Sequence, residues 1–264
     1  MNLTPEATDR AAALLWSTWR DHGRIDALPA DVRPATPEAG FAVQAAVARH
    51  AADSRFGWKI AATSKAGQTH IGVDGPLPGM LLSRRILPAP ARFSLAGNLM
   101  CVAEPEFAFR FRIALPPRAA EYTQAEVLDA VESLHPAIEV PDSRYRDFAK
   151  AGAPQLIADN ACASWFSPGA ATSADWRSID LSRQPVRAFI NGAPAGEGSG
   201  ANVLGDPRIA LTWIANALSR FGTGLAAGEM VTTGTCVTPV PVRPGDTVTA
   251  DFGVLGRIEA AFVA

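Results

Sequence analysis

Two glutamates spaced two residues apart are the feature of this sequence that most strongly suggests chemistry. Glu104 and Glu106 lie in a run from Cys101 to Arg112 in which apolar and charged residues alternate. In a β-strand, residues i and i+2 project from the same face, so this spacing predicts two neighbouring carboxylates. Such carboxylates repel each other unless a cation or water separates them. The pair therefore indicates either a metal site or the solvated face of a half-buried strand.

A third acid, Glu139, lies inside the short apolar run at 136–140. A carboxylate in such surroundings needs a partner, which is either a metal ion or a salt bridge, for example to Arg144 or Arg146. Together with the first two glutamates it would form an all-oxygen ligand set. That set suits Mg²⁺ or Mn²⁺ better than zinc, which prefers His and Cys.

Lys59 is the fourth residue of interest, because it lies in the otherwise apolar run at 57–62. A buried lysine requires an anion, and an acidic metal site or a substrate carboxylate would supply one. The alternative is a lysine on an edge strand that extends into water.

The elements that position these residues follow from local signals. Two helices are expected in an N-terminal helical part over residues 1–56, starting at Pro5 and Pro37 after the N-cap residues Thr4 and Thr36. From residue 57 to 264 short strands dominate. We expect strands over 58–63, 99–113 and 186–190, loops over 72–79 and 196–200, and helices from Thr123 to Pro136 and from Asp206 to Gly222. This order predicts an α+β fold with a curled mixed sheet.

Composition limits the classes of function. The 264 residues include 48% hydrophobic and 19% charged residues with a net charge of −2, which does not indicate a nucleic-acid-binding protein. No run is long enough for a membrane helix, and three scattered cysteines favour a reducing cytoplasm over a disulfide framework. Dinucleotide, P-loop and nucleophile-elbow motifs are missing from the sequence.

Several segments resemble the 2-oxopent-4-enoate hydratase/4-oxalocrotonate decarboxylase group of the fumarylacetoacetate hydrolase-like superfamily. They run in the same order along most of the chain and comprise 38–44, 57–64, 104–109, 136–139, 142–144, 158–161, 204–207, 233–235 and 241–246.

This resemblance implies a mixed β-roll with a small helical N-terminal part, usually in a homo-oligomer. It implies that Glu104, Glu106 and Glu139 bind Mg²⁺ or Mn²⁺, which chelates a 2-oxo acid substrate, and that Lys59 lies beside that substrate. Thr235 is expected to contact the substrate in the manner of the hydratases.

Two positions depart from the family pattern. The hydratase branch usually has Pro-Asp-aromatic-Gly after the lysine strand, and here Leu77 takes the place of that acid. Asp74 lies three residues earlier and is the substitute we consider for proton transfer. Cys162 replaces a serine that often contacts the substrate.

The resemblance implies a lyase that hydrates a 2-hydroxy-2,4-dienoate to a 4-hydroxy-2-oxo acid in aromatic-compound catabolism. Leu77 favours the alternative, decarboxylation of a 4-oxalocrotonate-type diacid, whose second carboxylate would need a cation such as Arg84, Arg85 or Arg144. An acylpyruvate hydrolase would need a His–Glu pair, for which His50 is the available histidine. A degenerate subunit without activity is the non-enzymatic alternative.

Overall fold

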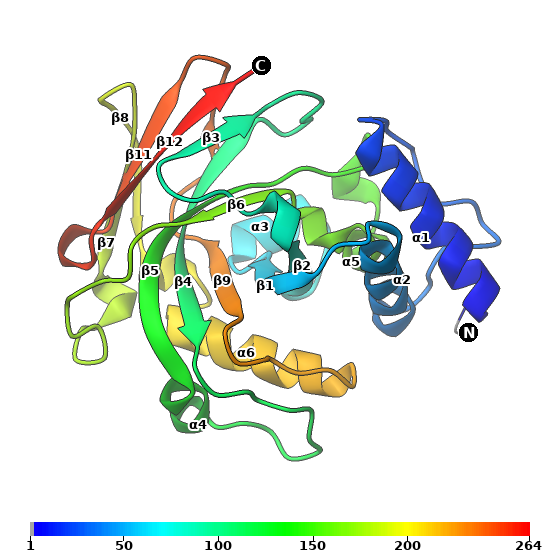
Figure 1. Cartoon of the computed structure of the whole chain (residues 1–264), viewed down its shortest axis with the longest axis horizontal. Helices are drawn as coiled ribbons and strands as arrows, with labels where there is room; N and C mark the ends of the chain where they lie inside the picture. Colours follow the sequence, from blue (N-terminus) through cyan, green and yellow to red (C-terminus); the bar gives the residue numbers. More distant parts are fainter. Residues whose placement is uncertain (1–2) are drawn as a thin grey trace.

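The computed structural model describes residues 3–264, which form two curled β-sheets flanked by helices (Figure 1). The α-helices are α1 (Pro5–Arg20), α2 (Pro37–His50), α3 (Lys65–His70), α4 (Gln124–Asp129), α5 (Ala153–Ala158) and α6 (Pro207–Arg220). The strands are β1 (Arg55–Ala61), β2 (Leu77–Leu82), β3 (Ala91–Ser94), β4 (Val102–Phe111), β5 (Val131–Val140), β6 (Trp165–Pro168), β7 (Pro185–Ile190), β8 (Ala193–Ser199), β9 (Met230–Thr235), β10 (Val240–Pro241), β11 (Thr247–Asp251) and β12 (Arg257–Val263).

The larger sheet has the strand order β2-β1-β9-β4-β5-β6, with β10 paired to β4, and the smaller has the order β3-β12-β11-β7-β8. Both sheets are mixed. The larger contains the parallel pair β1–β9 and the antiparallel pair β4–β5, and the smaller contains the parallel pair β3–β12 and the antiparallel pair β11–β12. Phe107 of β4 meets Phe252 edge to face, with 5.2 Å between ring centroids, and joins the two sheets. The predicted α+β fold with a mixed β-roll is confirmed.

The two N-terminal helices begin where the sequence predicts. The hydroxyls of Thr4 and Thr36 each accept a backbone N–H of the first turn at 3.2 Å, and proline follows each cap. Helix α1 then packs onto the rest of the chain through Trp19, whose ring lies 4.2 Å below the guanidinium carbon of Arg144. Strand β1 starts at Arg55, one residue before the end of the predicted helical part at residue 56. The division of the chain into a helical part (1–56) and a β-roll (57–264) stays a prediction.

One predicted helix is wrong. The capping box of Thr123 and Glu126 does start α4, but the helix ends at Asp129, and residues 131–140 form strand β5. Strand β5 pairs with β4 along nearly its whole length and with β6 at its end, so Pro136 lies within a strand and does not end a helix. Hydrogen bonds to strands on both sides of this segment outweigh the helical spacing of its apolar residues. Periodicity in the sequence does not reveal such pairing, so it does not distinguish a helix from a strand here.

Three shorter segments also differ from what the sequence predicts. The loop expected over 72–79 ends at Leu77, where β2 begins, and the segment at 196–200 belongs mainly to strand β8 rather than to a loop. The short helix α3 was not predicted, although Ser64 caps it by accepting the N–H of Gly67 at 3.0 Å. Over residues 3–264, no helix combines the length and apolar character needed to cross a bilayer.

A buried ion pair holds the segment after α5 in place, which leads to a stability prediction. Asp159 binds the guanidinium of Arg144 and also accepts the hydroxyl of Ser143 at 2.7 Å, and both charged side chains are almost completely buried. Asp159→Ala should lower the free energy of unfolding by about 3–5 kcal/mol, because it leaves the Arg144 charge buried and unpaired.

Urea denaturation measures this loss. The matched control is Asp26→Ala, which removes the exposed pair with Arg146 and should cost less than about 1 kcal/mol. Equal losses in the two variants would contradict the structural role assigned to the buried pair.

Candidate functional site

Three glutamates meet on one face of the larger sheet. Glu104 of β4 is directly opposite Glu139 of β5, and Glu106 lies two residues further along β4 on the same face. One carboxylate oxygen from each residue lies within 4.8 Å of the others. The structure therefore brings together the three acids that the sequence singled out, and cross-strand pairing supplies the third.

Burial excludes the solvated-face alternative for these acids. Glu106 is 1% exposed and Glu139 is 0% exposed, while Glu104 is partly buried at the edge of a cavity. One oxygen of Glu106 accepts the hydroxyl of Thr232 and the N–H of Gly234, the latter at 2.8 Å. Both oxygens of Glu139 are buried without an aligned hydrogen-bond donor among the described residues.

Lys59 is the cation of this site. Strand β1 lies between β2 and β9, so the alternative of an edge-strand lysine in water is wrong, and the side chain is 3% exposed. Its Nζ lies 3.2 Å from Oε1 of Glu139, close enough for an ion pair although not aligned as a hydrogen bond. The suggested salt bridges to Glu139 do not form, since Arg144 pairs with Asp159 and Arg146 with Asp26.

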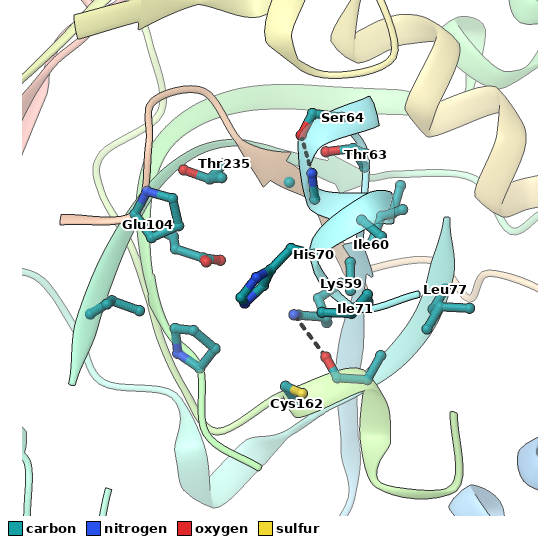
Figure 2. A pocket seen from close by; sticks show the side chains of 18 of the residues that line it. Lys59, Ile60, Thr63, Ser64, His70, Ile71, Leu77, Glu104, Cys162 and Thr235 are labelled. Carbon is teal, nitrogen blue, oxygen red and sulfur yellow. Dashed lines mark hydrogen bonds between the residues drawn. The ribbon is translucent and has the colours of Figure 1, made fainter. Parts of the chain in front are cut away.

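Close backbone approach places the lysine side chain. Gly79 of β2 is the cross-strand partner of Lys59, and a Cβ there would lie 2.9 Å from Lys59 Cγ and 2.3 Å from the carbonyl oxygen of Asn160. Only glycine leaves room for both. The ammonium then donates a hydrogen bond to the carbonyl of Ala161 at 3.0 Å (Figure 2).

The segment that supplies this carbonyl has unusual backbone geometry. Asn160, Ala161 and Cys162 all have left-handed φ values, of 59°, 48° and 63°. The side-chain amide of Asn160 holds the segment to β2 through the N–H and carbonyl of Met80, at 2.9 and 2.8 Å. Strained conformations of non-glycine residues persist where surrounding contacts hold them. Here they bring the carbonyl of Ala161 and the side chain of Cys162 into the site.

The electrostatic balance of the site is unfavourable without a further cation. Burial raises the pKa of Glu104 to about 7, and the charge of Glu139 adds to this effect. Burial and the neighbouring carboxylates raise the pKa of Glu106 well above its ordinary value, and burial also raises that of Glu139. Burial by itself favours neutral Lys59, but the three glutamates outweigh it and hold the pKa of the ammonium above its ordinary value.

These properties fit a hard divalent cation. Three carboxylates face one ammonium, and the oxygens of Glu139 lack an aligned hydrogen-bond donor among the described residues. All the potential ligand atoms are carboxylate oxygens. Such donor sets hold Mg²⁺ while leaving positions for water and substrate. Glu104, Glu106 and Glu139 are the residues that would hold the ion.

A cavity of about 750 Å³ opens beside the glutamates (Figure 2). Four of the residues predicted to act on the substrate line it: Lys59, Leu77, Cys162 and Thr235. Burial raises the pKa of the Cys162 thiol to about 12, so this residue is a neutral thiol and not a nucleophile. Asp74 lies on the exposed stretch between α3 and β2 and does not line the cavity; its proposed role in proton transfer stays a prediction.

The structure also shows which other predicted groups are absent from the cavity wall. Arg84, Arg85 and Arg144 do not line it, so none of them supplies a second cation there. His50 pairs with Asp9 at 2.9 Å between α1 and α2, which removes the basis for a hydrolytic His–Glu pair.

His70 does line the cavity, and sequence reasoning missed it. It is the last residue of α3, and Figure 2 shows its ring directed into the cavity. The N-cap signal at Ser64 was the one clue that a helix would carry this histidine there.

Comparisons with known proteins support an enzymatic site. Residues 87–263 match the model of the fumarylacetoacetate (FAA) hydrolase C-terminal family. A 2-hydroxyhexa-2,4-dienoate hydratase of Comamonas testosteroni is 36% identical over 193 residues, which cover 72% of each chain. A 4-oxalocrotonate decarboxylase of a Pseudomonas species is 33% identical over 204 residues, which cover 77% of each chain.

A solved structure covers the complete fold. The 4-oxalocrotonate decarboxylase of Pseudomonas putida G7, complexed with magnesium and adipate, matches with a TM-score of 0.89 and 27% identity over 99% of each chain. Another structure of that enzyme is complexed with calcium and acetate. On the evidence of its sequence, its fold and its acidic site, the chain belongs to the fumarylacetoacetate hydrolase family, among enzymes named as 2-keto-4-pentenoate hydratases and 4-oxalocrotonate decarboxylases.

Proposed function

We propose that this protein is a divalent-metal-dependent lyase that hydrates a 2-hydroxy-2,4-dienoate to a 4-hydroxy-2-oxo acid in the catabolism of aromatic compounds. The observation that carries the proposal is the cluster of Glu104, Glu106, Glu139 and Lys59, which contributes Lys59 and Glu104 to the lining of a mainly apolar cavity. The 36% identical relative is named as a hydratase of such a dienoate, which supports this choice of reaction.

The proposed cofactor is Mg²⁺ or Mn²⁺, held by the three glutamates. When bound, the ion supplies a Lewis acid that stabilises negative charge on the C2 oxygen of a 2-oxo acid. The glutamates are already oriented for this task by the β4–β5 pairing and by the hydrogen bonds from Thr232 and Gly234 to Glu106. Little reorganisation is therefore needed when the ion binds.

Lys59 is the proposed acid–base residue. Its raised pKa keeps the ammonium protonated, so Nζ can donate a hydrogen bond to an anionic substrate oxygen. The charge of a bound divalent cation would offset that of the glutamates and bring this pKa down toward the range suited to proton transfer. The carbonyl of Ala161 and the carboxylate of Glu139 orient that ammonium. Thr235 and Cys162 are proposed substrate contacts, and Asp74 remains the proposed second proton-transfer residue.

Decarboxylation of a 4-oxalocrotonate-type diacid is the second candidate. Leu77 is 5% exposed and forms part of the cavity wall where the hydratase pattern has an acid. Both reactions pass through a substrate with negative charge on the C2 oxygen, so the same glutamates and lysine serve either one. The choice between them depends on groups further along the cavity.

Two further expectations belong to the proposal. We propose that the protein is a homo-oligomer acting on a small-molecule 2-oxo acid, which size-exclusion chromatography with light scattering would test. We also propose a cytoplasmic location, which three free cysteines support.

Removing one metal ligand tests the metal site. Glu106→Ala should abolish metal-dependent activity and weaken Mg²⁺ binding at least about 100-fold, because outer contacts of metal ligands alone account for 10- to 100-fold. Titration calorimetry with Mg²⁺ and a circular dichroism spectrum measure affinity and fold. Glu132→Ala, an exposed acid on β5 outside the cluster, should leave both unchanged. Unaltered Mg²⁺ affinity in Glu106→Ala would remove the metal hypothesis.

The raised pKa of Glu104 predicts a dependence of stability on pH. The folded protein holds this proton up to about pH 7, whereas the unfolded chain releases it near 4.5, so stability falls as the pH rises through that window. The melting temperature of metal-stripped protein should therefore be lower at pH 8 than at pH 5.5, and Mg²⁺ should raise it more at pH 8.

Differential scanning fluorimetry with Mg²⁺ or EDTA measures both effects. In Glu104→Gln, which has no ionisable group at this position, the fall in melting temperature between the two pH values should be smaller. An equal Mg²⁺-induced rise at both pH values would contradict the predicted competition between metal and protons.

Product analysis tests the reaction itself. With Mg²⁺ or Mn²⁺, 2-hydroxypenta-2,4-dienoate should yield a 4-hydroxy-2-oxo acid, detected by mass spectrometry as the addition of one water. Release of CO₂ from 2-oxohex-3-enedioate without hydration of the dienoate would favour the decarboxylase. If neither reaction occurs and EDTA does not alter oxalate binding, the enzyme proposal fails.

A further inference from the structure

The cavity has two lining residues that can carry positive charge, and they differ in what they already bind. Among the described residues that line it, these are Lys59 and His70. Lys59 is committed to Glu139 and to the carbonyl of Ala161. The imidazole of His70 forms no hydrogen bond with any residue in 3–264 and is directed into the cavity (Figure 2).

The position of His70 is determined by local structure. It ends α3, which begins at the N-cap Ser64 just after the lysine strand, and its ring packs edge-on against Phe148 with 5.8 Å between centroids. The side chain is otherwise exposed, so both ring nitrogens are accessible to a ligand. An exposed histidine that merely packs against an aromatic ring is the structural alternative.

The rest of the wall is poorly suited to a charged substrate tail. It is formed mainly by apolar side chains, including Ile71, Leu77, Met100, Val102, Phe148 and Leu156. A hydrocarbon tail needs nothing more, whereas a carboxylate placed among these residues needs a charge-bearing donor. The side chains of Thr235 and Asn202 are neutral and already donate to the backbone carbonyls of Val237 and Cys236. The other hydroxyls of the wall, including those of Thr63 and Thr238, are neutral as well.

From this arrangement we propose that His70 determines substrate specificity by binding a second carboxylate at the distal end of the substrate, so that the enzyme acts on a dicarboxylic 2-oxo or 2-hydroxydienoic acid. This inference rests on the proposed function, because the metal and Lys59 must hold the 2-oxo acid end. It names the class of substrate and is compatible with either hydration or decarboxylation.

Binding of two saturated analogues tests the inference without depending on the reaction. 2-Oxohexanedioate and 2-oxohexanoate share the 2-oxo acid end and differ in the distal carboxylate. Titration calorimetry of Mg²⁺-loaded protein should show the diacid binding roughly 10- to 100-fold more tightly, the range expected for a hydrogen bond to a charged group.

Three variants separate recognition from packing. His70→Phe keeps an aromatic ring against Phe148 but has no donor, so the preference for the diacid should fall to within about twofold. His70→Gln keeps a hydrogen-bond donor in place of the imidazole and should retain part of the preference. His50→Phe, a histidine outside the cavity, should leave the preference unchanged.

Retention of the full preference in His70→Phe, or its absence in the wild type, would overturn the inference. Oxalate, which has no distal end, reports on the metal site by itself and should bind all proteins equally in a Mg²⁺-dependent way. Failure of oxalate to bind the wild type would instead overturn the proposed function, and this inference with it.

Discussion

Repulsion among three carboxylates, two of them buried and one partly buried, is the constraint on which the site depends. Glu104 and Glu139 face each other across an antiparallel strand pair, and Glu106 is the next residue on the same face. Like charges in direct cross-strand contact are destabilising, and burial removes the water that would screen them. One ammonium, that of Lys59, compensates only part of this charge. The fold thereby holds open a place for a second, divalent cation at a cost in its own stability.

The surrounding sheet and loops maintain this arrangement. Strand β9 lies between β4 and β1, and this order places Thr232 against Glu106 and Lys59 against Glu139. The segment at 160–162 reaches the same point from the other side, and the Arg144–Asp159 pair and Asn160 hold it against the sheet. Because each of these contacts is buried, the geometry of the charged groups is set before any ligand arrives.

Lys59 and Glu104 bring charge to a cavity whose lining is otherwise mainly apolar. This charged part is where the proposed function places the 2-oxo acid group. The remaining wall includes Leu77 and His70. Differences between family members in substrate and reaction are therefore expected to arise at this wall, where Leu77 takes the place of the acid in the hydratase pattern.

The sequence by itself determined the features that depend on neighbouring residues in the chain. Proline after a threonine cap predicted the starts of α1 and α2, and alternation placed Glu104 and Glu106 on one face. These signals are local, because caps, turns and strand faces are set within a few residues.

Only the tertiary structure decided which distant residues meet. A capping box specifies where α4 begins but not where it ends, and pairing with β4 and β6 turned residues 131–140 into a strand that brings Glu139 opposite Glu104. Burial of Lys59 likewise depends on the strands at either side of β1. The exposure of His70 to the cavity depends on α3, the short helix that follows β1. Strand order and register arise from contacts between residues far apart in the sequence, which local patterns do not encode.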